Sequence, residues 1–241
     1  EATEDLLAAI DDSQEWDDLT TREKLQIQGF YDALDEKHKD YPPEWSALKV
    51  WEKRDNAEMV LLALDSMGSD FMERHCLEAL ERMGNPAAVE PMLERAEKRD
   101  KPAIRILGKA GDERAVETLN EFTDGDVGLQ RVTLRSLGEI GSEESTQAVA
   151  DQLVADDASV RSHAARALGM IGDTRAVAPL ADALADDEAD NVRASAAWAL
   201  VQIGTEDALE AAAEYADDRA YIVSAEAEAA ARALEDDAVP A

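Results

Sequence analysis

The chain of 241 residues carries 55 Asp and Glu against 24 Lys and Arg, giving a formal net charge of −31, and 45% of its residues are hydrophobic. This composition supports a buried core, and the negative charge opposes nonspecific binding to nucleic acid or anionic lipid. A single cysteine excludes an internal disulfide and a thiolate metal cluster within one chain, and no apolar run reaches the roughly 18 residues of a membrane span.

The distribution of charge resembles that of proteins from organisms that keep molar salt in the cytoplasm. Lysine does not occur after Lys109, whereas pairs of aspartate continue as far as Asp236 and Asp237. In molar salt the Debye length is roughly 3 Å, so repulsion among surface carboxylates is mostly screened. We therefore expect a cytoplasmic protein of halophile type, whose acidity is an adaptation of the whole surface.

The N-terminal region differs from the rest of the chain in its aromatic content. Six of the eleven aromatic residues occur within the first 51 residues, namely Trp16, Phe30, Tyr31, Tyr41, Trp45 and Trp51. Residues 1–41 are predicted to form an N-terminal helical cap, and residues 42–68 an atypical first repeat. The aromatic residues have two interpretations: they fill the core of the cap, or they form an apolar docking patch.

Similar segments recur every 27 to 32 residues after the N-terminal region. Each segment closes on a glycine, and a leucine stands four residues before it; the glycines are Gly84, Gly111, Gly141, Gly172 and Gly204. Small or apolar residues also stand one and five residues before each glycine. These offsets fall on one stripe of a helix, so each segment predicts a helix with one buried face. A glycine just past the last apolar residue favours the left-handed conformation that ends a helix.

A second helix is predicted directly after each glycine. The next residue is Asn85, Asp112, Ser142, Asp173 or Thr205, and all five can accept hydrogen bonds as N-caps. The positions five and eight after the glycine are mostly apolar, as in Val89 and Met92. Each unit is therefore a helical hairpin that must stack on its neighbours to bury its apolar stripe.

The segments V-R-S-H-A-A-R-A-L-G-M-I-G-D-T-R-A-V-A-P-L and V-R-A-S-A-A-W-A-L-V-Q-I-G resemble HEAT repeats of the kind first noted in phycobilin lyases. The resemblance covers roughly residues 69–218, and the repeat at 97–125 departs from it because Pro102 shortens its first helix. It implies an all-α fold, an α-α superhelix. We expect the repeat array to span residues 42–218, followed by a capping helix and tail at 219–241.

The side chains give little support for an enzymatic activity. Deoxyhypusine hydroxylase, a HEAT-like family, holds two irons with His-Glu pairs, but the histidines here are followed by Lys39, Cys76 and Ala164. Cys76 occupies an alanine position of the repeat and is predicted to be a core residue rather than a nucleophile. We therefore expect no catalytic residue, no metal and no cofactor. A lyase-like or redox-associated accessory role stays open as the alternative that the resemblance implies.

The most regular surface feature is a column of acids on the second helices. Ten residues after each glycine stand Glu94, Glu121, Asp151, Asp182 and Glu214, and four residues earlier stand Glu90, Glu117 and Glu210. Because the resemblance implies that second helices line the concave face, these acids would line a groove for a protein partner, one of basic character. The alternative is a uniformly acidic surface, on which any solvent-facing column would be acidic.

Arginines at the repeat junctions are expected to brace neighbouring repeats. Arg161 and Arg193 follow Val160 and Val192, and Arg114 and Arg175 stand in the turns; family resemblance gives them carboxylate partners. No basic stripe is predicted, so nucleic acid ranks last among the partners. The leading function is a noncatalytic scaffold or adaptor that presents an extended surface to a protein partner.

Overall fold

The computed structural model describes residues 44–66 and 70–237, in which helices joined by turns are found and no strand occurs. Helices α3 (Glu44–Lys53) and α4 (Ala57–Ser66) come first. Five hairpins follow, in which the first helices are α5 (Asp70–Met83), α7 (Lys101–Ala110), α9 (Val127–Ile140), α11 (Ala158–Ile171) and α13 (Asp190–Ile203). The second helices are α6 (Val89–Ala96), α8 (Val116–Asn120), α10 (Thr146–Ala150), α12 (Val177–Asp186) and α14 (Glu206–Ala213), and α15 (Tyr221–Asp237) ends the array.

The predicted helix ends are confirmed at all five repeat glycines. Each of them has a positive φ between 60° and 77°, the left-handed conformation that glycine adopts without a steric penalty. At Gly172 the backbone N–H donates to the carbonyl oxygen of Leu168, which closes α11. The shortening caused by Pro102 is also confirmed, since α7 has 10 residues where α5, α9, α11 and α13 have 14.

The second helices begin as the sequence predicts in four repeats of five. The side chains of Asn85, Asp112, Asp173 and Thr205 accept hydrogen bonds from backbone N–H groups two or three residues later. Ser142 is the exception: it is buried and its hydroxyl makes no capping bond. A short 3-10 turn precedes the second helix in the first four hairpins, namely η1 (Pro86–Ala88), η2 (Glu113–Ala115), η3 (Glu143–Ser145) and η5 (Thr174–Ala176), and a further turn, η4 (Asp151–Val154), extends α10.

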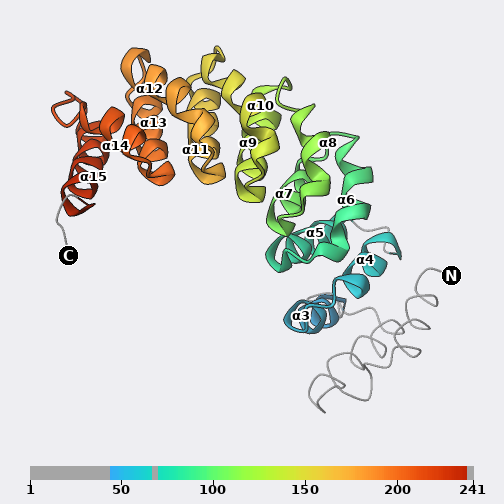
Figure 1. Cartoon of the computed structure of the whole chain (residues 1–241). Coiled ribbons are helices and arrows are strands. Elements are labelled where there is room, and N and C mark those ends of the chain that lie inside the picture. Colours follow the sequence, from blue (N-terminus) through green and yellow to red (C-terminus); the bar gives the residue numbers. More distant parts are fainter. Residues whose placement is uncertain (1–43, 67–69, 238–241) are drawn as a thin grey trace.

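The stacked hairpins form a curved array whose inner side is made by the first helices. Figure 1 shows α5, α7, α9 and α11 along the inside of the arc and α6, α8, α10 and α12 along the outside. Glycines explain the bend: a Cβ added at Gly108, Gly138 or Gly169 would lie within 3.0 Å of a backbone Cα on the next first helix. These first helices therefore approach one another more closely than residues with side chains would allow. The prediction that second helices line the concave face is wrong.

A continuous apolar core runs between the two layers of helices. Leu80, Leu107, Leu137, Leu168 and Leu200, the leucines four residues before each glycine, are fully buried. Trp51 on α3 is also buried, at 4% exposure, so this residue belongs to the core and not to an exposed docking patch. Trp16, Phe30, Tyr31 and Tyr41 lie outside the described residues, as does the side chain of Trp45. For these five the two interpretations stay as predicted.

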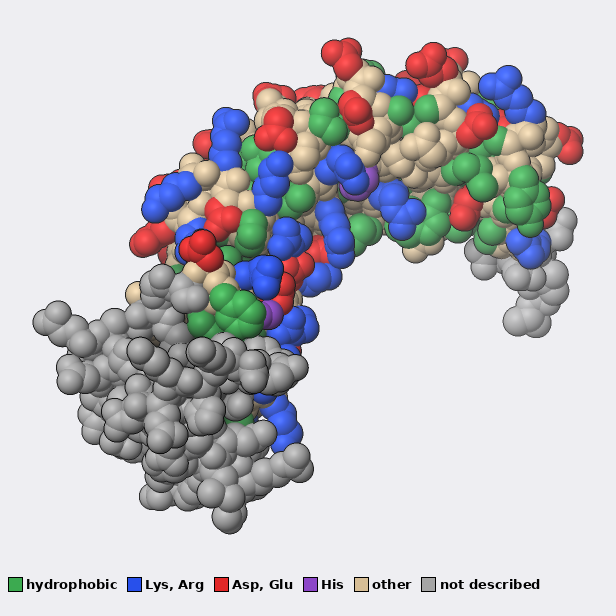
Figure 2. Space-filling model, turned by 180° about the vertical axis from the view of Figure 1, so that it is seen from behind, with side chains coloured by type: hydrophobic (Ala, Val, Ile, Leu, Met, Phe, Trp, Pro, Cys, Tyr) green, Lys and Arg blue, Asp and Glu red, His purple; other side chains and the backbone are tan. Residues whose placement is uncertain are grey.

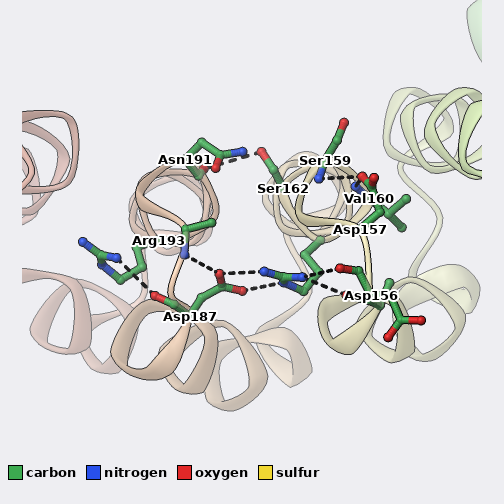
Figure 3. A network of polar contacts seen from close by, with 11 residues as sticks. Asp156, Asp157, Ser159, Val160, Ser162, Asp187, Asn191 and Arg193 are labelled. Carbon is green, nitrogen blue, oxygen red and sulfur yellow. Dashed lines mark hydrogen bonds and ion pairs between the residues drawn. The ribbon is translucent and has the colours of Figure 1, made fainter.

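The predicted arginine braces are confirmed in the C-terminal repeats. Arg161 donates two hydrogen bonds to Asp187 of the next repeat, at 2.6 and 3.0 Å, and its third nitrogen reaches the carbonyl oxygens of Ala155 and Asp156 (Figure 3). Arg193 repeats the arrangement with Asp218 and also donates to the Asp187 carbonyl oxygen. The chain of contacts therefore links the last two hairpins to the segment that precedes α15.

The two turn arginines bind differently from each other. Arg114 pairs with Asp112 and reaches Glu90 of the preceding repeat, as predicted. Arg175 pairs with Asp173, but its contact to the preceding repeat is the backbone carbonyl oxygen of Glu143 rather than a carboxylate. The carboxylate that crosses this junction is Asp173 itself, which accepts from the Thr146 hydroxyl at 2.7 Å.

Asp173 gives this junction a dependence on pH. The hydrogen bond from Arg175 lowers the pKa of the buried Asp173 carboxyl from 3.8 to about 2. A carboxylate with a depressed folded-state pKa stabilises the protein above its unfolded pKa and loses that contribution as the pH falls through the folded value. We expect the melting temperature to fall less between pH 4 and pH 2 in Asp173→Asn than in the unsubstituted protein, as followed by circular dichroism. Asp182→Asn, which alters an exposed acid, should leave the slope unchanged; equal slopes in all three proteins would contradict this prediction.

Candidate functional site

The predicted acidic column lies on the convex side of the array. Glu94, Glu121, Asp151, Asp182 and Glu214 are all exposed, as are Glu90, Glu117 and Glu210 on the same second helices. Because the second helices form the outer layer in Figure 1, these eight acids do not line the concave face of the array. The column exists as a surface feature, but its predicted place on the concave face is wrong.

A basic stripe occupies the opposite face, on the first helices. It consists of the positions ten, six and two residues before each repeat glycine, spaced four residues apart along each helix. We call this set the concave stripe: Arg74, Glu78 and Arg82 on α5; Lys101, Arg105 and Lys109 on α7; Arg131, Arg135 and Glu139 on α9; Ser162, Arg166 and Met170 on α11; Ala194, Trp198 and Gln202 on α13. Eight of these fifteen positions are Arg or Lys and two are Glu, so the stripe is positive within a strongly negative chain.

Helix geometry turns the concave stripe away from the core. The buried leucine stands four residues before the glycine, and the middle position of the stripe stands six residues before it. In a helix of 3.6 residues per turn these two positions point in nearly opposite directions from the helix axis. Arg74, Arg82, Lys109, Arg131 and Arg135 are accordingly exposed. Figure 2 shows Lys and Arg side chains gathered along the inner edge of the arc, whereas Asp and Glu are more frequent along its outer edge.

Part of the positive charge is held by intramolecular pairs. Arg105 pairs with Glu81 at 2.9 Å, and Glu139 accepts from both Lys109 and Arg135, at 2.8 and 3.0 Å. The Arg105–Glu81 and Lys109–Glu139 pairs join neighbouring first helices, whereas Arg135 and Glu139 are both on α9. Arg74, Arg131 and Arg166 form no ion pair with any residue in the described part of the chain. The Arg74 guanidinium lies 5.8 Å from the centre of the Phe71 ring, and the Arg166 guanidinium lies 4.8 Å from the centre of the Trp198 ring. Three guanidinium groups of the stripe are thus available to an anionic ligand.

The array therefore separates its charges, with a basic concave side and an acidic convex side. This finding corrects two expectations, that no basic stripe exists and that every solvent-facing column would be acidic. The missed signal was present in the sequence, because Arg105, Arg135 and Arg166 recur six residues before successive glycines. Opposite charges on the two faces orient an approaching charged partner, and a concavity lined by one sign concentrates the field.

The residues considered for catalysis do not assemble into a reactive site. Cys76 is fully buried, as predicted, and burial raises the pKa of its thiol to about 12, so it stays protonated at neutral pH. His75 Nδ1 lies 3.2 Å from Glu78 on its own helix, and His163 Nδ1 contacts the carbonyl oxygen of Ser159. Within residues 44–66 and 70–237, no three His, Cys, Asp or Glu side chains are grouped to hold a metal ion.

None of the helices within residues 44–66 and 70–237 has both the length and the apolar character needed to cross a bilayer.

Comparisons with known proteins identify the repeats. Residues 118–200 and 150–232 match the family of HEAT repeats. No curated protein matches the chain.

Several solved structures have a similar arrangement of helices. Human deoxyhypusine hydroxylase in complex with glycerol is 18% identical, with 89% of this chain and 97% of that chain covered and a TM-score of 0.40. The complex of CpcE and CpcF of phycocyanin lyase from Nostoc sp. PCC7120 is 20% identical, with 90% and 94% covered and a TM-score of 0.49. An engineered protein is 20% identical, with 81% and 64% covered and a TM-score of 0.48. The repeat matches and the stacked hairpins of Figure 1 together identify residues 118–232 as an array of HEAT repeats.

Proposed function

We propose that the chain is a noncatalytic cytoplasmic scaffold that binds an acidic segment of a partner protein along its concave stripe. The observation that carries this proposal is the segregation of charge, with eight basic residues on the concave side of a protein of net charge −31. An acidic segment placed there contacts the exposed guanidinium groups of Arg131 and Arg135, while the acidic convex face repels it from other positions.

An acidic protein segment fits this stripe better than the backbone of a nucleic acid does. Glu78 and Glu139 are part of the stripe, and Glu81 lies beside it in contact with Arg105. A continuous row of phosphates would have to pass these carboxylates, whereas a peptide can place its acidic residues only where arginines stand. The overall charge of −31 adds long-range repulsion against a polyanion.

Charge reversal on each face tests the proposal. The probe is a fluorescein-labelled peptide of twelve alternating Glu and Ser residues, and binding is followed by fluorescence anisotropy. In the variant with Arg105→Glu, Arg131→Glu and Arg135→Glu we expect binding to weaken at least tenfold, since three attractive contacts become repulsive. Binding should also weaken as salt is added, because these side chains are exposed to solvent.

The matched control reverses the same number of charges on the convex face. Glu121→Lys, Asp151→Lys and Asp182→Lys should leave peptide binding equal or slightly tighter. Loss of peptide binding in this variant alone would contradict the concave site. A chromophore absorbance in the purified protein would contradict the noncatalytic role and support the lyase-like alternative.

A further inference from the structure

The concave stripe changes its chemistry between α9 and α11. On α5, α7 and α9 seven of its nine positions are basic, whereas on α11 and α13 the six positions hold one charge, that of Arg166. The remaining positions there include Met170 and Trp198. Met170 is 45% exposed, among the few large apolar side chains of the described residues that are turned to solvent. The C-terminal part of the stripe is therefore an apolar surface next to a basic one.

Each of these two apolar side chains packs against a glycine of the preceding first helix. A Cβ added at Gly169 would lie 2.8 Å from Cζ3 of Trp198, and one added at Gly138 would lie 3.3 Å from the sulfur of Met170. Trp198 thus extends from α13 over α11, and Met170 extends from α11 over α9. Arg166 completes the surface, with its guanidinium 4.8 Å from the Trp198 ring centre. Methionine, a guanidinium plane and an indole ring present a continuous surface of the kind that receives an apolar side chain.

We propose that Met170, Arg166 and Trp198 form an anchor site for one apolar, preferably aromatic, residue of the same acidic segment that the basic part of the stripe binds. This inference rests on the proposed function and adds the chemistry and spacing of the partner. A buried aromatic anchor beside charged contacts is the arrangement that concentrates binding energy in protein interfaces. Arg166 has no ion pair among the described residues, so its guanidinium can donate hydrogen bonds to a carboxylate next to the anchored side chain.

The geometry of stacked helices sets the spacing between the acidic run and the anchor. Trp198 and Arg135 occupy the same repeat position two hairpins apart, and neighbouring packed helices are about 8–10 Å apart, which gives roughly 16–20 Å between them. An extended chain covers about 3.3–3.6 Å per residue, so about five or six residues separate the two contacts. A partner segment is therefore expected to carry its aromatic residue about five or six positions beyond the acidic side chain that binds Arg135.

Four peptides test this anchor by fluorescence anisotropy. All carry six alternating Glu and Ser residues and a Gly-Ser spacer; three end in Trp after two, six or twelve spacer residues, and the fourth has Ser in place of Trp after six. We expect the six-residue spacer with Trp to bind about tenfold tighter than its Ser counterpart, and the two-residue spacer to gain little. The gain should disappear in Met170→Ser, which alters an exposed residue without adding charge, and in Trp198→Ala, so that the Trp and Ser peptides bind equally well to each variant.

The outcomes separate the anchor from the proposed function. If the Trp and Ser peptides bind equally and both are lost on charge reversal at Arg105, Arg131 and Arg135, the anchor is wrong and the acidic-segment scaffold stands. If no peptide binds, both proposals fail. If twelve-nucleotide oligothymidine binds more tightly than the Trp peptide, and this binding is lost in Trp198→Ala, the surface is a nucleic-acid site and the anchor for a protein segment is wrong.

Discussion

Replacement of Arg161 by alanine is expected to lower the free energy of unfolding by about 3–5 kcal/mol, the range seen when one partner of a buried ion pair is removed. The side chains of Arg161 and Asp187 are 12% and 7% exposed, so the substitution leaves a carboxylate without its charge partner inside the array. It also removes the hydrogen bonds to the carbonyl oxygens of Ala155 and Asp156. Urea denaturation followed by circular dichroism at constant salt measures the change.

Two further variants show whether the buried pair causes this effect. Arg135→Ala removes an exposed ion pair with Glu139, and such pairs contribute about 0–1 kcal/mol, so its midpoint should hardly move. Arg161→Lys keeps the charge but loses the two-pronged contact to Asp187, and we expect an intermediate loss. Equal losses in Arg161→Ala and Arg135→Ala would show that the buried brace does not stabilise the array.

The second large effect is expected at Gly169, on the inner layer of helices. A Cβ at this position would lie 2.7 Å from the backbone Cα of Ala199, so Gly169→Val forces α11 and α13 apart. Overpacking of this kind costs about 1–3 kcal/mol, although valine is the better helix former. Because the inner layer opens, the array should also straighten, which small-angle X-ray scattering detects as a larger radius of gyration.

Gly172→Ala is the matched control for a glycine with a different role. Gly172 has a φ of +77° and nothing within 4 Å of an added Cβ, so alanine there costs about 1–2 kcal/mol of backbone strain. It should leave the radius of gyration unchanged. The explanation of the curvature is wrong if Gly169→Val unfolds at the same urea concentration as the unsubstituted protein and scatters identically.

The repeat architecture was predictable from the sequence because its determinants are local. The glycines predict where each first helix ends, and the leucines four residues before them predict which face of that helix is buried. Both predictions were confirmed. The direction of curvature was not predictable in the same way. It depends on how closely Gly108, Gly138 and Gly169 let the next repeat approach, which is a contact between segments about 30 residues apart.

The candidate site could not be predicted because it depends on which helices form the inner side of the array. Since the first helices do, their exposed positions form the concave surface, and the arginines that recur on them make this surface basic. The sequence correctly predicts that the acidic column faces solvent, but the face of the array on which it lies depends on the curvature. The burial of Trp51 could not be predicted either. An aromatic residue near the end of an array looks the same in the sequence whether it is buried in the core or exposed to a partner.

Zero-length cross-linking with carbodiimide tests the central claim most directly, because it joins carboxylates to lysine amines and this chain has few lysines. Lys101 and Lys109 belong to the concave stripe, whereas the exposed Lys98 lies in the turn after α6. With the alternating Glu and Ser peptide, mass spectrometry should find peptide adducts on Lys101 and Lys109 and few on Lys98 or on Lys49 and Lys53. Adducts spread evenly over all lysines, or confined to those outside the stripe, would contradict binding on the concave face.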